Sequence, residues 1–166
     1  MSAPQSGKPG WRSAFVGGMR AGLTSVFMVV LVGSYVSIGA LAHDLNFPLL
    51  WIVLSTVLIW AAPAQVILIS ALGAGAPPLE VALAVGLSGV RLLPMVVALL
   101  PVVKAPSTRP RELIVPAHFT AVSMWIEALR LSPKLPRTAR IPYVNGLGVC
   151  FMASATIASV IGYHLA

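Results

Sequence analysis

The polar residues best suited to chemistry lie between Trp60 and Arg91, within stretches that are otherwise strongly apolar. Pro63 and Gln65 interrupt one apolar run, and Arg91 lies at the middle of the next, two residues after Gly89. Arginine at the centre of a membrane helix costs about 2.5–3.5 kcal/mol on insertion scales, so it usually serves a pathway or a bound ion. Gly89 would allow a second backbone to approach the arginine. We predict that Pro63, Gln65, Gly89 and Arg91 form a substrate-binding site, with a carboxylate held near Gln65 and Arg91.

Pro63 is expected to shape the backbone of this site. A proline removes one N–H group and clashes with the carbonyl one turn earlier, which predicts a break or kink near residues 59–63. A half-helix beginning there would carry free N–H groups and a partial positive charge, which suit a carboxylate. The alternative is a kinked but continuous helix in which Gln65 bonds a neighbouring carbonyl. For Arg91, weighed separately, the alternative is a purely structural role.

His118 and Glu127 are candidates for an ion relay. Histidine titrates near neutral pH, which suits a relay, although a hydrogen-bonded packing role is the alternative for His118. Glu127 precedes Arg130 by three residues, so the two side chains can pair on one helix. The sequence has no cluster of His and Cys at metal-ligand spacing, no phosphate-binding glycine loop and no nucleophile beside a base. We therefore predict no metal, no cofactor and no enzymatic activity.

The composition is that of a membrane protein. The 166 residues are 58% hydrophobic and only 9% charged, whereas soluble domains carry about 25% charged residues. The net charge of +7 comes from basic residues in the N-terminal tail and in the loops 101–111 and 131–141. Such residues pair with anionic headgroups on the cytoplasmic side of a membrane. We predict contact with membrane lipids and no binding of nucleic acid.

The pattern of apolar runs predicts an all-α, polytopic membrane helix bundle with about five apolar segments, at least one of them broken or kinked near Pro63. About 20 helical residues cross the hydrocarbon core, and the runs have roughly that length. Residues 1–15 are interpreted as a flexible cytoplasmic tail and 16–166 as a single transmembrane domain. The five expected segments are 16–42, 48–72, 79–100, 112–130 and 142–166. Pro94 should kink the third of them just after Arg91.

Two features of the topology stay open. Segment 112–130 is either a bundle helix with a polar stripe toward a pathway or an amphipathic helix on the membrane surface. If the first three segments all crossed, the basic tail and the basic loop 101–111 would lie on opposite sides, against the positive-inside tendency. A broken or re-entrant second or third segment would remove that conflict, and so would an imperfect charge bias.

Three stretches together resemble the AzlC family. The run Trp60-Ala61-Ala62-Pro63-Ala64-Gln65, continued by the turn 72–77, is similar to that family's small-residue glutamine box. The stretch 33–42 resembles its glycine-containing first helix, and Gly89-Val90-Arg91 resembles its asparagine-leucine-arginine segment in a variant form. The likeness covers roughly residues 14–165, in a chain shorter than the usual member.

The resemblance implies a function and partners. AzlC proteins are large subunits of exporters for branched-chain amino acids in the bacterial inner (plasma) membrane, and they work with a small AzlD-like membrane subunit. On this resemblance, the chain would be a multi-pass permease that exports small or branched-chain amino acids, with Gln65 and Arg91 at matching positions. The alternative is a non-transporting membrane subunit or assembly scaffold in which Gln65 and Arg91 are structural.

Overall fold

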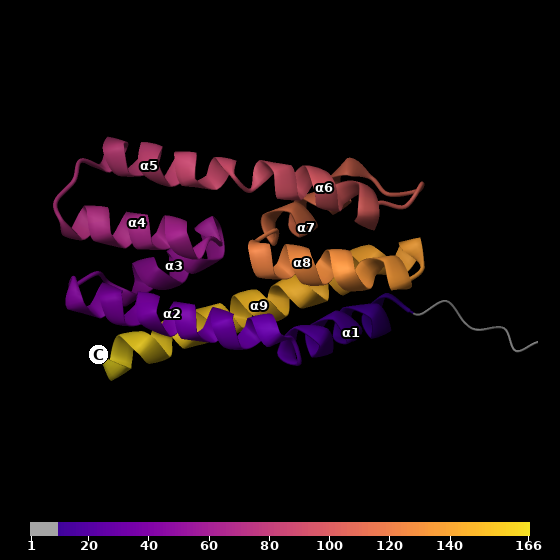
Figure 1. Ribbon diagram of the computed structural model, residues 1–166, viewed down its shortest axis with the longest axis horizontal. Helices are drawn as coiled ribbons and strands as arrows, with labels where there is room; N and C mark the ends of the chain where they lie inside the picture. Colours follow the sequence, from indigo (N-terminus) through magenta and orange to yellow (C-terminus); the bar gives the residue numbers. More distant parts are fainter. Residues whose placement is uncertain (1–9) are drawn as a thin grey trace, which may run out of the picture.

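The computed structural model describes residues 10–166, and every regular element in that range is a helix (Figure 1). The predicted all-α class is therefore confirmed. The longer helices are α1 (Trp11–Leu23), α2 (Val26–Asp44), α3 (Leu49–Ile59), α4 (Ala62–Gly73), α5 (Pro78–Val90), α6 (Leu93–Val103), α8 (Val122–Leu131) and α9 (Arg137–Leu165). The short ones are α7 (Ile114–His118) and the 3₁₀ turns η1 (Pro110–Leu113) and η2 (Ser132–Lys134).

Among the described residues, two helices are individually long and apolar enough to cross a membrane. These are α2 and α9, with 19 and 29 residues. The helices α5 and α6 are joined through a 45° bend and pass the same test as a pair, which gives a third candidate span. The bend follows Arg91, and Pro94 lies in the first turn of α6, as predicted for this segment. The chain is thus a multi-pass membrane protein.

Apart from α1, the remaining helices form two pairs that enter the molecule from opposite ends (Figure 1). The chain runs inward along α3 and returns along α4 to the end from which it came. After α6, it enters from the other end through η1 and α7 and returns along α8. The turns of the two pairs lie near the middle of the molecule, between the longer helices. Short, broken helices of opposite direction are typical of sites at the membrane midplane in transporters.

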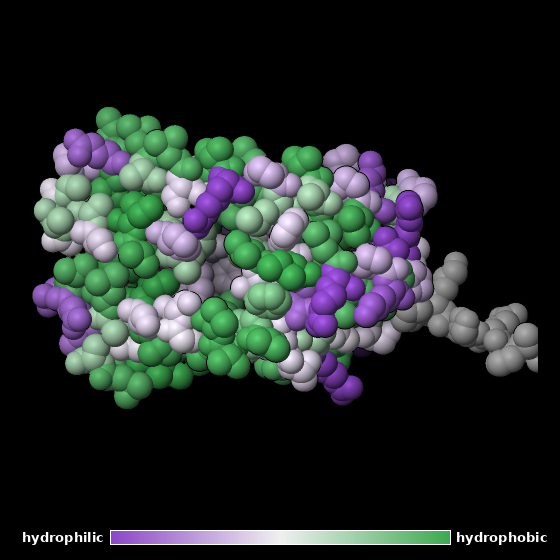
Figure 2. Space-filling model, in the orientation of Figure 1, coloured by the Kyte–Doolittle hydropathy of each residue, from purple (hydrophilic) through white to green (hydrophobic). Residues whose placement is uncertain are grey.

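This arrangement removes the topological conflict found in the sequence. Because α3 and α4 do not cross, the start of α1, the α6–η1 loop and the α8–α9 connection all lie at one end (Figure 1). Hydrophilic residues gather most densely at that end, and hydrophobic residues cover much of the surface between the two ends (Figure 2). Asp44 ends α2 and Glu80 lies in the first turn of α5, both at the opposite end. The charge distribution agrees with the positive-inside tendency.

The core is built around α9, against which α1 and α2 both pack closely. Gly39 of α2 faces the Ser159 carbonyl of α9, and Gly18 of α1 faces the Tyr143 carbonyl. A Cβ at either glycine would overlap that backbone oxygen. Small residues permit this approach without the hydrophobic driving force that water would supply, because lipid is as apolar as the side chains.

The structure corrects three expected boundaries. Segment 16–42 is two helices, because the chain breaks at Thr24 and Ser25, where the Ser25 hydroxyl accepts a hydrogen bond from the N–H of Phe27 at 3.1 Å and caps α2. Helix α1 begins at Trp11, within the predicted tail, whose residues 1–9 lie outside the described range. Segment 112–130 is neither a continuous bundle helix nor a surface helix, because it turns back between α7 and α8.

Candidate functional site

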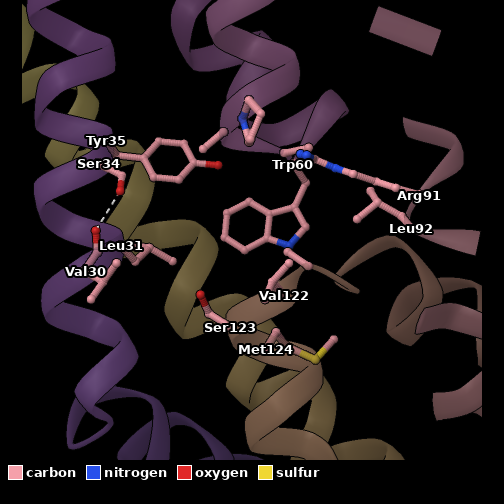
Figure 3. A pocket seen from close by; sticks show the side chains of 14 residues that line it. Val30, Leu31, Ser34, Tyr35, Trp60, Arg91, Leu92, Val122, Ser123 and Met124 are labelled. Atoms are coloured by element: carbon pink, nitrogen blue, oxygen red, sulfur yellow. Dashed lines mark hydrogen bonds between the residues drawn. The ribbon is translucent and has the colours of Figure 1, made fainter. Parts of the chain in front are cut away.

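A pocket with a volume of about 130 Å³ lies where the two helix pairs meet α2 and the α5–α6 junction (Figure 3). Four parts of the chain line it. They are Val30, Leu31, Ser34 and Tyr35 of α2, residues 60–63 at the α3–α4 turn, Arg91 and Leu92 at the α5–α6 junction, and residues 121–124 at the start of α8.

The α3–α4 turn presents the start of a half-helix to this pocket. Trp60 has a left-handed backbone (φ 47°), and Ala61 is extended. Helix α4 then begins at Ala62, with Pro63 in its first turn. The N–H of Gln65 donates to the carbonyl of Ala61 at 3.0 Å, so the earlier N–H groups of α4 have no acceptor within the helix. The predicted break near Pro63 is confirmed, and the partial positive end of α4 faces the pocket.

The N-terminus of α8 also faces the pocket, from the direction opposite to that of α4. Ala121 is extended, and the N–H of Trp125 donates to its carbonyl at 2.7 Å. The preceding N–H groups, of Val122, Ser123 and Met124, are therefore free of intrahelical acceptors, and all three residues line the pocket. Two half-helix N-termini thus converge on one small volume.

Two hydrogen bonds join the turns of the opposing pairs. The Trp60 indole Nε1–H donates to the Phe119 carbonyl at 2.9 Å. His118 Nε2 lies 2.8 Å from the Val57 carbonyl, and because a carbonyl only accepts, Nε2 must carry the proton. The two acceptors belong to the C-terminal ends of α3 and α7, where partial negative charge collects. These bonds satisfy the negative ends, whereas the positive ends of α4 and α8 remain open to the pocket.

Arg91 adds a full positive charge. It follows α5 directly, and its side chain extends from the α5–α6 junction toward Trp60 (Figure 3). Within residues 10–166 it forms no hydrogen bond or ion pair through its guanidinium, and the residues that line the pocket include no carboxylate. The site is therefore electropositive, with five unused N–H donors on the guanidinium.

The predicted site residues are only partly brought together. Pro63 and Arg91 line the pocket, but Gln65 does not. Gln65 is fully buried, and its Nε2 donates to Ser55 Oγ at 3.0 Å and to Thr56 Oγ1 at 2.9 Å, which links α4 to α3. Gly89 is absent from the lining, and a Cβ there would meet open space, so no backbone of the described chain approaches it.

The proposed relay residues also lie in separate contacts. Glu127 is 2% exposed and accepts hydrogen bonds from Ser25 Oγ at 2.5 Å and from Arg130 Nε at 2.9 Å. Its pairing with Arg130 is as predicted. His118 instead holds the Val57 carbonyl, and a relay through His118 and Glu127 stays a prediction. In the described range, no group of three or more His, Cys, Asp or Glu residues could hold a metal ion.

Replacing Gln65 with leucine tests whether its role is structural. Its Oε1 is buried without a hydrogen-bond partner in residues 10–166, and such a group costs about 1–3 kcal/mol. The Ser55 and Thr56 hydroxyls already donate to the Ile52 carbonyl, so they keep that partner in the variant. We expect Gln65→Leu to melt at the same or a higher temperature than the unchanged protein. A large fall in melting temperature would show that the amide bonds dominate.

Sequence reasoning did not identify Tyr35, Trp60 or the start of α8 as parts of the site. One signal was available, because each turn places an aromatic residue shortly before an alanine that precedes a helix. The two instances are Trp60-Ala61 before α4 and Phe119-Thr120-Ala121 before α8. Phe119 and Thr120 are both common inside apolar helices. The sequence pattern therefore offered no reason to predict a turn between α7 and α8.

Comparison with known proteins gives one match. Residues 26–166 match the family model described as AzlC protein. No curated protein and no solved structure matches the chain. The match covers most of the sequence, includes every residue that lines the pocket, and agrees with the multi-pass helical fold. The chain therefore belongs to the AzlC family, a transporter-component family of membrane proteins linked to branched-chain amino acids and not a family of enzymes.

Proposed function

We propose that the chain is a permease that exports small or branched-chain amino acids, and that the pocket holds the substrate carboxylate between Arg91 and the N-termini of α4 and α8. The observation that carries this proposal is the convergence of three sources of positive charge in a pocket that no acidic side chain lines. Each helix N-terminus stabilises an anion by about 0.3–1 kcal/mol, and by up to about 2 kcal/mol where partly buried. Hydrogen bonds to a charged group add about 1.5–3 kcal/mol.

The size and walls of the pocket support a small aliphatic substrate. An engineered cavity of about 150 Å³ holds benzene, and this pocket, at about 130 Å³, is of similar size. Valine as a whole has eight non-hydrogen atoms, two more than benzene, so a pocket of this size suits only a small amino acid. Leu31, Leu92 and Val122 supply an apolar wall for it.

The direction of transport, the inner-membrane location and a small AzlD-like partner are part of the same proposal and follow from the resemblance to the family. One feature of the fold supports a partner subunit. Helix α5 buries only Val81 in the described structure, and a Cβ at Gly86 or Gly89 would meet open space. A span with small residues and so little packing suits close contact with another membrane helix.

Replacing Arg91 tests the carboxylate site directly. We expect Arg91→Ala to lower the rate of valine efflux from loaded cells by about 10–100-fold, because hydrogen bonds to a charged group are lost. The efflux rate of Arg91→Lys should lie between those of the unchanged protein and Arg91→Ala, since lysine keeps the charge but lacks the planar guanidinium. Arg109→Ala is the matched control, because Arg109 is exposed in the α6–η1 loop and does not line the pocket.

Two outcomes would favour other conclusions. Unchanged efflux in Arg91→Ala at normal membrane abundance would contradict the carboxylate site. Efflux that falls only in proportion to membrane abundance would favour the scaffold alternative, in which Arg91 and Gln65 are structural. Abundance is measured on the same cells by quantifying a C-terminal tag.

A further inference from the structure

Tyr35 is the polar side chain of the pocket whose role the carboxylate site leaves unexplained. It is 4% exposed, and its hydroxyl has no hydrogen-bond partner among residues 10–166. Figure 3 shows the hydroxyl pointing away from α2 into the pocket, on the side of Trp60. The hydroxyl oxygen is not among the buried atoms that lack a partner, because it opens onto the pocket, where a bound molecule can reach it.

The hydroxyl is held in place before any ligand arrives. The Tyr35 ring stacks on the Trp60 indole, with ring centroids 6.1 Å apart and an interplanar angle of 20°. Trp60 is fixed in turn by its bond to the Phe119 carbonyl. Because both rings are almost fully buried, Tyr35 cannot change rotamer without disturbing the turn between α3 and α4. Such preorganisation is what a specificity-determining group requires.

An amino acid brings an ammonium group as well as a carboxylate, and the pocket has few acceptors for it. Arg91 and the free N–H groups of α4 and α8 are all donors. The Ser34 hydroxyl is oriented by its own bond to the Val30 carbonyl at 2.8 Å. The phenolic oxygen of Tyr35 keeps two lone pairs, and an aromatic ring also attracts a cation. The Ser34 and Ser123 hydroxyls can also accept, but of these three lining hydroxyls only that of Tyr35 belongs to a buried, stacked side chain that is fixed before a ligand arrives.

We infer that the Tyr35 hydroxyl accepts a hydrogen bond from the α-ammonium group of the substrate, which makes the pocket select amino acids over the corresponding acids that lack the amine. This inference rests on the proposed carboxylate site. It assigns Tyr35 a role in specificity, separate from that of Arg91, since an acid without the amine still meets Arg91 and the helix N-termini but leaves Tyr35 without a partner.

The test uses the full chain in detergent and two probes that differ at one group. The probes are valine and 3-methylbutanoate, in which a hydrogen replaces the ammonium group, so no donor or acceptor is left at that position. Dissociation constants are measured from the ligand-dependent change in tryptophan fluorescence, which Trp60 in the pocket wall should report. We expect Tyr35→Phe to bind valine about tenfold more weakly, as loss of one hydrogen bond to a charged group predicts. Its affinity for 3-methylbutanoate should not change.

Controls separate this inference from the proposed function. Tyr35→Phe keeps the ring that stacks on Trp60, and its ligand-free melting temperature shows whether the fold is intact. Tyr163→Phe, the same substitution at a tyrosine of α9 that does not line the pocket, should change neither affinity. Arg91→Ala should lower the affinity for both probes by a similar factor.

Each result decides something. If Tyr35→Phe weakens both probes equally, or leaves valine unchanged, the ammonium assignment is overturned while the carboxylate site stands. If Arg91→Ala leaves both affinities unchanged, or if the unchanged protein binds neither probe, the proposed function fails and this inference fails with it.

Discussion

A leucine at Gly39 is expected to prevent stable folding of the chain. A Cβ at this position would overlap the Ser159 carbonyl oxygen and lie 2.7 Å from the Tyr163 nitrogen. Both obstacles are backbone atoms of α9, so no side-chain rotation can relieve the overlap, and α2 and α9 must move apart along their whole contact. We expect a loss of more than about 4 kcal/mol, which only a few mechanisms can produce. The yield of monodisperse protein after extraction from membranes measures it.

Gly33 provides a matched control on the same helix. A Cβ at Gly33 would meet nothing within 4 Å, so a leucine there points into open space. Gly33→Leu makes the same chemical change six residues earlier and should alter stability by no more than about 0.5 kcal/mol. Equal loss of folded protein in both variants would show that glycine is needed for its backbone freedom and not for close helix contact.

The second large effect is expected at Glu127. Its carboxylate accepts from Ser25, which caps α2, and from Arg130 on α8, so it ties the α1–α2 break to α8. Glu127→Ala removes both bonds and leaves the buried Ser25 hydroxyl without its acceptor. Because the Arg130 side chain is 62% exposed, water can solvate it, and the free energy of unfolding should fall by about 3 kcal/mol. Thermal melting in detergent measures it.

Glu112→Ala is the control for this substitution. Glu112 is exposed at η1, and its replacement should change the melting temperature little. The melting temperature of Glu127→Gln should lie between those of Glu112→Ala and Glu127→Ala, because an amide oxygen can still accept from Ser25 but no longer carries charge. A wild-type melting temperature in Glu127→Ala would contradict the structural role and turn attention to Glu127 as a relay residue.

The breaks that the sequence predicts are those that proline causes. Pro63 and Pro94 each lie in the first turn of a half-helix, because the ring tolerates that position and excludes a continuous ladder before it. The breaks at Ser25 and between α7 and α8 were not predictable in this way. The Ser25 hydroxyl donates to Glu127, and the Phe119 carbonyl accepts from Trp60. Both partners are distant in sequence, so these bonds cannot be inferred from the local pattern.

The candidate site was half predictable for a similar reason. The apolar runs around Arg91 and Gln65 predict that both lie at membrane depth, but they do not show which way each side chain points. Gln65 follows Pro63 by two residues, which corresponds to about 200° around a helix, so the two face opposite sides of α4. Tyr35 was missed because an aromatic residue in an apolar run normally indicates packing.

The close pairing of α2 with α9 has a consequence for how the chain is made. Ser159 leaves the ribosome roughly 120 residues after Gly39, a delay on the order of 6–24 s at about 5–20 residues per second. During that interval, the bare glycine surface of α2 has only lipid or other inserted segments to contact. Insertion into the bilayer and completion of the tertiary structure are therefore separate events, because the contacts that join α2 to α9 can form only after α9 has been made.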